Sequence, residues 1–158
     1  MRHWAKARFY LQPMAEVTVS TDIDRTRSDV WEYLRDIGSH VDWMADAEAI
    51  RFTTEQVEGT GTSFECDTKI GPIRLTDLMT ITSWEDAAEM GVRHEGVVTG
   101  VGEFTLTDLD HGRTRFTWRE DLSFPLWLGG PIGEIAAKPI LTLVWKRNLK
   151  RLKSLLEQ

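Results

Sequence analysis

Apolar and polar residues alternate along much of the chain between positions 16 and 125. Residues 16–21 (EVTVST) are rich in β-branched side chains, a composition that favours a strand. Later segments show the same alternation or enrichment, and turn-forming residues separate them. Because these spacers are short, we expect the strands to pair antiparallel in a meander. The later segments are residues 50–54, 62–70, 73–84, 90–98, 102–109 and 114–124.

Helical spacing replaces alternation in two parts of the chain. After the first strand, residues 30–37 carry apolar side chains at helical intervals, and residues 39–44 predict a second short turn or helix. A long C-terminal helix is predicted from Pro131, and Pro139 is expected to kink or split it. The apolar stripe of this helix is predicted to be Ile132, Ile135, Ala136, Ile140, Leu143, Val144, Leu152, Leu155 and Leu156.

This order of elements predicts an α+β fold in which a seven-stranded curved antiparallel sheet wraps around the long C-terminal helix. Two short helices follow the first strand. The long helix is the only element large enough to cover the apolar face of the sheet, and a curved sheet around one helix leaves room for a cavity. We expect residues 14–158 to form one domain. Residues 1–13 would be an N-terminal arm, either disordered or the product of a misassigned start codon.

Composition and charge narrow the classes of function. The 158 residues are 41% apolar and 28% charged, which disfavours disorder and membrane classes. A net charge of −6 disfavours a nucleic-acid binder. No apolar run is long enough to span a bilayer. The segment 138–153 is basic and has no acid; it predicts a solvated helix face or a patch for transient contact with lipid headgroups.

The single cysteine, Cys66, excludes an internal disulfide and a cysteine-based zinc site. A buried, inert thiol in a reducing cytoplasm fits this composition. No histidine spacing typical of a metal site is present, nor any phosphate-binding loop. We therefore expect neither a metal nor a cofactor.

The alternation assigns three ionisable residues to the inner face of the sheet. Glu120 shares a face with aromatic neighbours, while the arginines of that strand lie on the other face. The same alternation along their strands places Asp77 and His94 on the inner face. Each of the three is either bonded to a neighbour for structural reasons or a group that orients a ligand or moves protons. His40, beside the short helix, is expected at the surface or the cavity rim.

Folding the hairpins at their turns predicts three rows across the sheet. Either Trp118 lies over the glycines of the second row, or those glycines leave space for a ligand, and the two are compatible. The rows are Met79, His94, Phe104 and Phe116; Asp77, Gly96, Gly102 and Trp118; and Leu75, Val98, Gly100 and Glu120.

Tryptophan is unusually abundant, with seven residues against two tyrosines. Most of these rings are expected to line or cover one cavity, with Trp43, Trp118 and Trp127 nearest the ligand. The residues predicted to contact a ligand are Trp43, Phe64, Met79, Phe104, Phe116, Trp118, Trp127, Ile140, Leu143 and Val144.

Five segments carry a family resemblance: residues 23–34 leading to Asp42-Trp43, residues 59–62, residues 80–84, residues 112–118 and residues 145–153. Through them the chain, over about residues 15–157, resembles the SRPBCC superfamily. That superfamily comprises START lipid-transfer domains, polyketide cyclases/dehydrases and birch-pollen-allergen-like proteins. The resemblance implies a helix-grip fold and a hydrophobic cavity. It assigns no site residue, because no catalytic motif is shared across the group.

Three functions follow as hypotheses. The first is binding or transport of a hydrophobic small molecule, such as a lipid or polyketide, in the cavity. The second is a cofactor-independent cyclase or aromatase/dehydratase in which His94 is the acid–base group and Asp77 or Glu120 sets its tautomer and pKa. The third is a protein-interaction module of the co-chaperone or toxin–antitoxin kind, which predicts a large exposed apolar patch.

Overall fold

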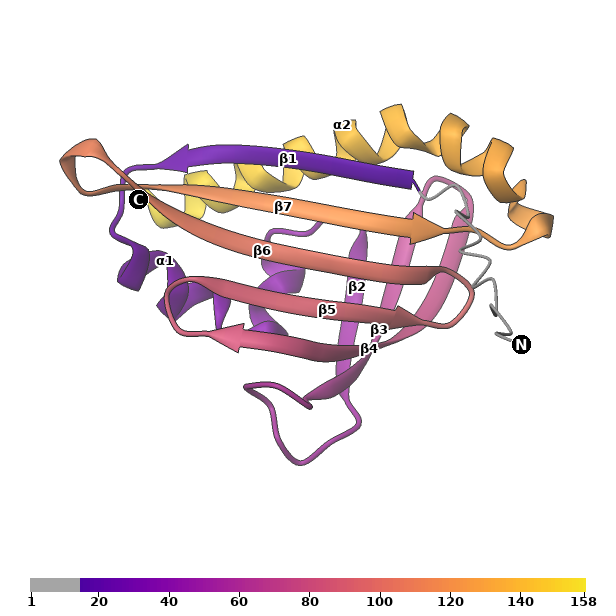
Figure 1. The fold of residues 1–158 in the computed structure, drawn as a ribbon, viewed down its shortest axis with the longest axis horizontal. Helices are drawn as coiled ribbons and strands as arrows, with labels where there is room; N and C mark the ends of the chain where they lie inside the picture. Colours follow the sequence, from indigo (N-terminus) through magenta and orange to yellow (C-terminus); the bar gives the residue numbers. More distant parts are fainter. Residues whose placement is uncertain (1–14) are drawn as a thin grey trace, which may run out of the picture.

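A computed structural model describes residues 15–158 (Figure 1). The predicted arm, residues 1–13, lies outside the described residues. The elements are β1 (Ala15–Ile23), α1 (Arg27–Leu34), η1 (Ile37–Asp42), β2 (Ala47–Phe52), β3 (Ser63–Ile70), β4 (Ile73–Glu85), β5 (Glu89–Glu95), β6 (Thr99–Leu109), η2 (Asp110–Gly112), β7 (Arg113–Ser123), η3 (Leu126–Leu128) and α2 (Gly130–Leu156).

The seven strands form one antiparallel sheet in the order β1-β7-β6-β5-β4-β3-β2. From β2 to β7 each strand pairs with the next along the chain, which confirms the predicted meander. β1 pairs with β7, so the chain crosses from one edge of the sheet to the other between β1 and β2. The helical segments α1 and η1 make that crossing, and α2 runs along β1 behind the sheet (Figure 1). The α+β helix-grip prediction is confirmed.

Short-range chemistry explains the first helix. Thr26 caps α1, because its hydroxyl accepts a hydrogen bond from the Asp29 backbone N–H at 3.3 Å. The buried face of α1 consists of Val30, Trp31 and Leu34, as the helical spacing predicted. The Trp31 indole N–H also donates to Asp86 at 3.2 Å, which ties α1 to the end of β4.

The face that α2 buries differs from the predicted one. Pro139 does not split the helix, which continues to Leu156. The predicted stripe is largely exposed, and among its members only Leu152 is buried. No helix in residues 15–158 is long and apolar enough to cross a membrane. The buried residues of α2 are Gly130, Glu134, Leu141, Trp145, Asn148, Leu149 and Leu152.

Two contacts set the rotation of α2. The Trp145 ring stacks on Trp118 of β7, with centroids 4.8 Å apart and an interplanar angle of 22°. Asn148 accepts a hydrogen bond from the Ala45 backbone N–H at 3.0 Å and donates to Asp46 at 2.5 Å. Both contacts lie on one side of the helix, and neither is visible in a hydropathy pattern.

The predicted rows across the sheet are out of register. His94 pairs with Gly100 rather than Phe104, because the β5–β6 turn lies nearer β5 than expected. Phe104 pairs with Trp118 rather than Phe116, because η2 lengthens the β6–β7 connection. The two pairings differ from the predicted ones by four and two residues. Because both differences are even, the side chains of these strands still point to the predicted face of the sheet.

His40 is buried, not at the surface. Its Nε2 donates to the Leu34 carbonyl oxygen at 2.7 Å, and its ring lies against Trp43 and Phe104. Burial lowers the pKa of His40 to about 4, so the imidazole is neutral at pH 7. Because the unfolded chain takes up this proton near pH 6.5, His40 lowers the stability of the fold as the pH falls from 6.5 to 4.

Asn148→Ala removes two hydrogen-bond partners from the segment between η1 and β2. We expect the free energy of unfolding, measured with urea, to fall by about 1–3 kcal/mol. Ser154→Ala on the exposed side of α2 is the control and should change it by less than about 0.5 kcal/mol. Equal, small effects of both changes would contradict the anchoring role of Asn148.

His40→Gln retains a donor for the Leu34 carbonyl and removes the titrating ring. Between pH 6.5 and pH 4, wild-type stability should decline more steeply than that of the variant, by up to about 1.4 kcal/mol for each pH unit. Urea unfolding at several pH values measures this difference. Ser154→Ala, which removes no titrating group, should leave the slope unchanged; identical slopes for wild type and His40→Gln would refute the assignment.

Candidate functional site

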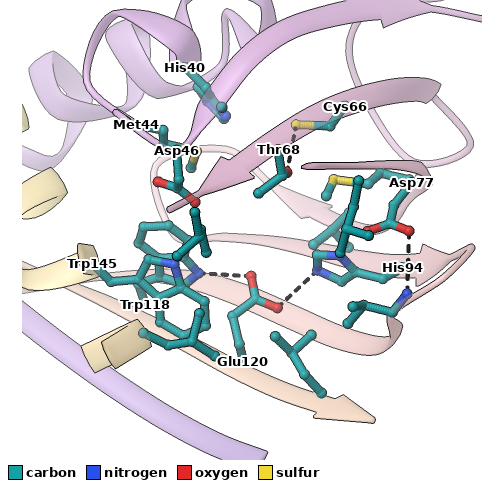
Figure 2. Close-up of a pocket in the computed structure, with 18 of the residues that line it drawn as sticks. His40, Met44, Asp46, Cys66, Thr68, Asp77, His94, Trp118, Glu120 and Trp145 are labelled. Atoms are coloured by element: carbon teal, nitrogen blue, oxygen red, sulfur yellow. Dashed lines mark hydrogen bonds and ion pairs between the residues drawn. The ribbon is translucent and has the colours of Figure 1, made fainter. Parts of the chain in front are cut away.

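A cavity of about 410 Å³ lies between the inner face of the sheet and α2 (Figure 2). Its volume is within the range of small-molecule sites, and its walls are mostly aliphatic and aromatic. Residues of η1, of strands β2 to β7 and of α2 contribute to the lining. The cavity reaches the surface beside Ile73 and Ile140, which are 44% and 54% exposed.

The predicted polar residues Glu120 and His94 meet on the cavity wall. His94 Nε2 lies 2.9 Å from Glu120 Oε2, and both side chains are almost fully buried. The Trp118 indole N–H donates to the other carboxylate oxygen, Oε1, at 2.8 Å. Figure 2 shows the chain of contacts from Trp118 through Glu120 to His94. Each oxygen of a buried carboxylate therefore has a donor, which compensates for much of its lost hydration.

Gly102 makes room for the Glu120 carboxylate. It pairs with Glu120 across β6 and β7, and a Cβ at this position would lie 2.4 Å from Oε1 and 2.5 Å from Oε2. Gly96 does the same for Asp77, where a Cβ would lie 2.4 Å from Oδ1. The glycines thus accommodate the carboxylates. The suggestion that Trp118 lies over them is wrong, since Trp118 pairs with Phe104.

Asp77 holds the β5–β6 turn. Its Oδ1 accepts from the backbone N–H groups of Val97 at 2.9 Å and Val98 at 3.4 Å. Burial raises the pKa of Asp77, and the two backbone donors partly oppose that rise. Asp77 lines the cavity but makes no hydrogen bond to His94. Of the two carboxylates considered as partners of His94, only Glu120 contacts the ring.

Two opposing effects act on His94. Burial lowers the pKa of the imidazole, but the adjacent Glu120 carboxylate and, more weakly, Asp77 outweigh it and raise the pKa above its usual value. Because Glu120 Oε2 is an acceptor, Nε2 carries a proton. Nδ1 makes no hydrogen bond to any of residues 15–158. His94 is therefore a ring with one nitrogen fixed and the other able to accept or donate a proton.

Asp46 is a further ionisable group of the cavity that sequence reasoning missed. It precedes β2 and receives the side-chain N–H of Asn148. Burial raises its pKa, while Asn148 and Trp145 partly oppose this. Figure 2 shows Asp46 and Trp145 on the same wall as Trp118. Asp46 lies outside every alternating segment, so no periodicity pointed to it.

The predicted ligand contacts divide between the cavity and other parts of the molecule. Trp43 and Phe116 are buried behind the lining, where Trp43 packs edge-on against Phe116 and Trp118. The prediction that Trp43 and Phe116 line the cavity is wrong, because both rings pack within the aromatic cluster formed with Phe104 and Trp118. The predicted contacts that do line the cavity are Phe64, Met79, Phe104, Trp118 and Ile140.

Three predicted contacts from η3 and α2 lie outside the lining. Trp127 is 69% exposed, because η3 turns it away from the sheet. Leu143 is half exposed and Val144 is also absent from the lining, because α2 is rotated toward Trp145. His40 and Cys66 do line it. Burial raises the pKa of the Cys66 thiol to about 11, so the thiol stays protonated at neutral pH.

The described part of the chain contains no set of residues arranged as metal ligands. No group of three or more His, Cys, Asp or Glu side chains in residues 15–158 is arranged to hold a metal ion. The polar groups of the cavity instead include two histidines, carboxylates and two indole N–H groups. These groups can orient a polar substituent of a ligand or exchange a proton with it.

Solved structures share the fold over nearly the whole chain. The Zhui aromatase/cyclase from Streptomyces sp. R1128 is 19% identical, with 91% of this chain and 94% of that chain covered and a TM-score of 0.70. A START superfamily protein from Mycobacterium smegmatis is 12% identical, with 89% and 98% covered and a TM-score of 0.71.

A two-domain relative shows the same fold in part of a longer chain. StfQ, a di-domain ARO/CYC from the steffimycin biosynthetic pathway, is 12% identical with a TM-score of 0.72, and the match covers 89% of this chain and 50% of that chain. No curated protein matches the sequence. The model of the family described as "Polyketide cyclase / dehydrase and lipid transport" matches residues 14–157, and the chain belongs to that family, within the SRPBCC superfamily.

Proposed function

We propose that the protein binds a hydrophobic small molecule, of the lipid or polyketide class, in the cavity between the sheet and α2. The observation that carries the proposal is an apolar cavity of about 410 Å³ inside a chain of only 158 residues. Void space of this size costs stability unless something fills it. The aliphatic and aromatic walls would supply most of the affinity.

The polar wall would fix the orientation of the ligand. His94 Nδ1 can accept a hydrogen bond from a hydroxyl group or, when the ring is protonated, donate one to a carbonyl group, while Nε2 donates to Glu120. A ligand with one such group and an apolar body matches a lining in which few polar residues stand among aliphatic ones. The unpaired, buried Cys66 fits a reducing compartment, and we include a cytoplasmic location in the proposal.

The pairing of His94 with Glu120 favours an acid–base enzyme as a second candidate function. A histidine with one nitrogen oriented by a carboxylate and the other unbonded is a suitable general base or acid. Such a group could remove or return a proton in a cyclisation or dehydration of a ketide-like substrate without a cofactor. Glu120 would then be a positioning residue that sets the tautomer and raises the pKa of His94.

Met79→Trp tests the binding proposal by filling the cavity. Met79 lines the cavity, whereas its neighbour Leu78 points to the outer face, so Leu78→Trp is a matched control. Titration with the neutral fluorescent probe N-phenyl-1-naphthylamine should give a dissociation constant at least about tenfold higher for Met79→Trp than for wild type. Leu78→Trp should bind as wild type does. Equal affinity of both variants would overturn the proposal, provided that thermal unfolding shows both to be folded.

Glu120→Gln tests the electrostatic origin of the His94 pKa. Without the carboxylate charge, desolvation dominates, and the pKa measured by NMR titration of the ring should fall below its wild-type value. Asp121→Asn, one residue away on the outer face, should leave it unchanged. A His94 pKa that does not move in Glu120→Gln would contradict the pairing.

Gly102→Ala tests the same pair by steric means. The added methyl group must displace the Glu120 carboxylate, so the His94 pKa should again fall, and stability should decrease by about 1–3 kcal/mol. Gly112→Ala is an instructive contrast, because a Cβ there meets no atom but the left-handed backbone is strained. It should lower stability without moving the His94 pKa. A change of the pKa by Gly112→Ala alone would refute the steric account.

His94→Gln separates the binder from the enzyme. If the second candidate holds, turnover of a β-hydroxy ketone or ketide thioester should fall by about 100-fold or more, while binding of N-phenyl-1-naphthylamine is retained. Turnover that survives in His94→Gln would exclude His94 as the acid–base group and leave the binding proposal intact.

A further inference from the structure

Large apolar side chains are exposed at the start of α2 and in the turn before it. Leu126 is 87% exposed, Trp127 69%, Ile132 80% and Ile135 73%, and Leu143 is half exposed. We call these five residues the α2 apolar face. A folded protein does not usually leave such a group of large apolar side chains in water unless they meet another surface.

Helical geometry extends this face along one side of α2. Ile132, Pro139 and Leu143 follow one another at intervals of seven and four residues, opposite the buried Trp145. The distance along the axis from Ile132 to Leu143 is about 16 Å at 1.5 Å per residue. The outer side of the first half of α2 is therefore an exposed apolar strip.

The outer side of the second half of α2 is basic. Five cationic side chains of the helix are exposed and form no ion pair within residues 15–158. The acid within α2, Glu134, is buried and accepts the Phe124 backbone N–H at 2.8 Å. α2 thus exposes positive charge and no negative charge, although the chain carries a net charge of −6. Lys138 lies in the first half of α2, and the other four, Lys146, Arg147, Lys150 and Arg151, lie in the second half.

The α2 apolar face adjoins the mouth of the cavity. Leu128, next to Trp127, lines the cavity, and so does Ile140 on the same part of α2. The start of β1 also lies nearby, since Ala15 pairs with Leu122 just before η3. The α2 apolar face and the cavity opening therefore share one end of the molecule, and the basic half of α2 continues from them along the same helix.

We propose that the α2 apolar face docks on the surface of a lipid bilayer that contains anionic lipids. Trp127 and the isoleucines would enter the interface between headgroups and acyl chains, and the basic half of α2 would lie on the headgroups. A second copy of the chain is a poor occupant, because in a symmetric pairing the facing α2 offers no exposed acid to the basic residues. A convex helix side, without a groove, favours a deformable lipid surface over a folded partner. The docking does not depend on what the cavity holds.

Flotation of the full-length protein with vesicles tests the proposal. Phosphatidylcholine vesicles with phosphatidylglycerol should carry the protein, and vesicles of phosphatidylcholine alone should carry much less. Added salt should release it, since salt screens the headgroup attraction. The double variant Trp127→Ser/Ile132→Ser should lower the bound fraction at least about tenfold, and Lys146→Glu/Lys150→Glu should abolish the preference for phosphatidylglycerol.

Matched controls come from exposed residues elsewhere on the molecule. Val101→Ser removes a half-exposed apolar residue from the outer face of β6, and Lys69→Glu reverses an exposed charge on β3; both should bind vesicles as wild type does. Binding that is equal in all variants would overturn the proposal, as would no binding at all. Self-association of wild type that Trp127→Ser/Ile132→Ser abolishes, without vesicle binding, would assign the face to a second copy. Capture of an acidic protein without vesicle binding would assign it to a protein partner and equally overturn the proposal.

Titration with N-phenyl-1-naphthylamine in the absence of vesicles separates this proposal from the cavity function. Trp127→Ser/Ile132→Ser should keep the wild-type affinity for the probe, because neither residue lines the cavity. If wild type binds the probe but not the vesicles, the docking proposal is refuted and the cavity function is not. If wild type binds the vesicles but not the probe, the cavity function is refuted and the docking proposal is not.

Discussion

The buried Glu120 carboxylate sets the requirements for much of the surrounding structure. A charge in an apolar wall is costly unless donors replace its water, and the structure supplies one donor for each oxygen: Trp118 and His94. Space for the carboxylate comes from Gly102 on the neighbouring strand. Because Trp118 also stacks on Trp145, the same network positions α2 on the sheet. Site geometry and helix placement thus share one set of contacts.

The cavity is a consequence of how α2 is held. Trp145 and Asn148 fix the helix near the middle of its length, against β7 and the segment before β2. The first half of α2, by contrast, buries few of its apolar side chains and covers the cavity incompletely. One end of the structure is therefore firmly packed, with His40 and the aromatic rings that surround Trp43. The other end is open, and there Ile73 and Ile140 reach solvent. Ligand entry and the apolar part of the proposed bilayer contact both lie at the open end.

Alternation in the sequence was sufficient for the strands and for the side of the sheet that each residue faces. It brought Asp77, His94 and Glu120 to the cavity, because an error of an even number of residues does not change the face. The same reasoning could not give the register, since β5–β6 pairing depends on a turn held by Asp77 rather than on hydropathy. The family resemblance added the cavity but no site residue.

The helix α2 shows the limit of hydropathy more clearly. Its buried side includes the polar Asn148 and Glu134, while apolar residues such as Ile132 and Ile135 are exposed. A stripe chosen by apolarity alone therefore selected the wrong side. Asp46 was missed for a related reason: it acquires its place in the cavity through Asn148, a residue 102 positions away. Long-range polar contacts of this kind have no periodic signal.

Native mass spectrometry of the freshly purified protein tests whether the cavity holds a hydrophobic ligand. We expect a second species heavier than the polypeptide, lost on organic extraction and absent from Met79→Trp, in which the cavity is filled. The extract should then contain an apolar molecule with a carbonyl or hydroxyl group. A single mass equal to that of the polypeptide, together with an extract free of such a molecule, would show that the cavity holds no hydrophobic ligand.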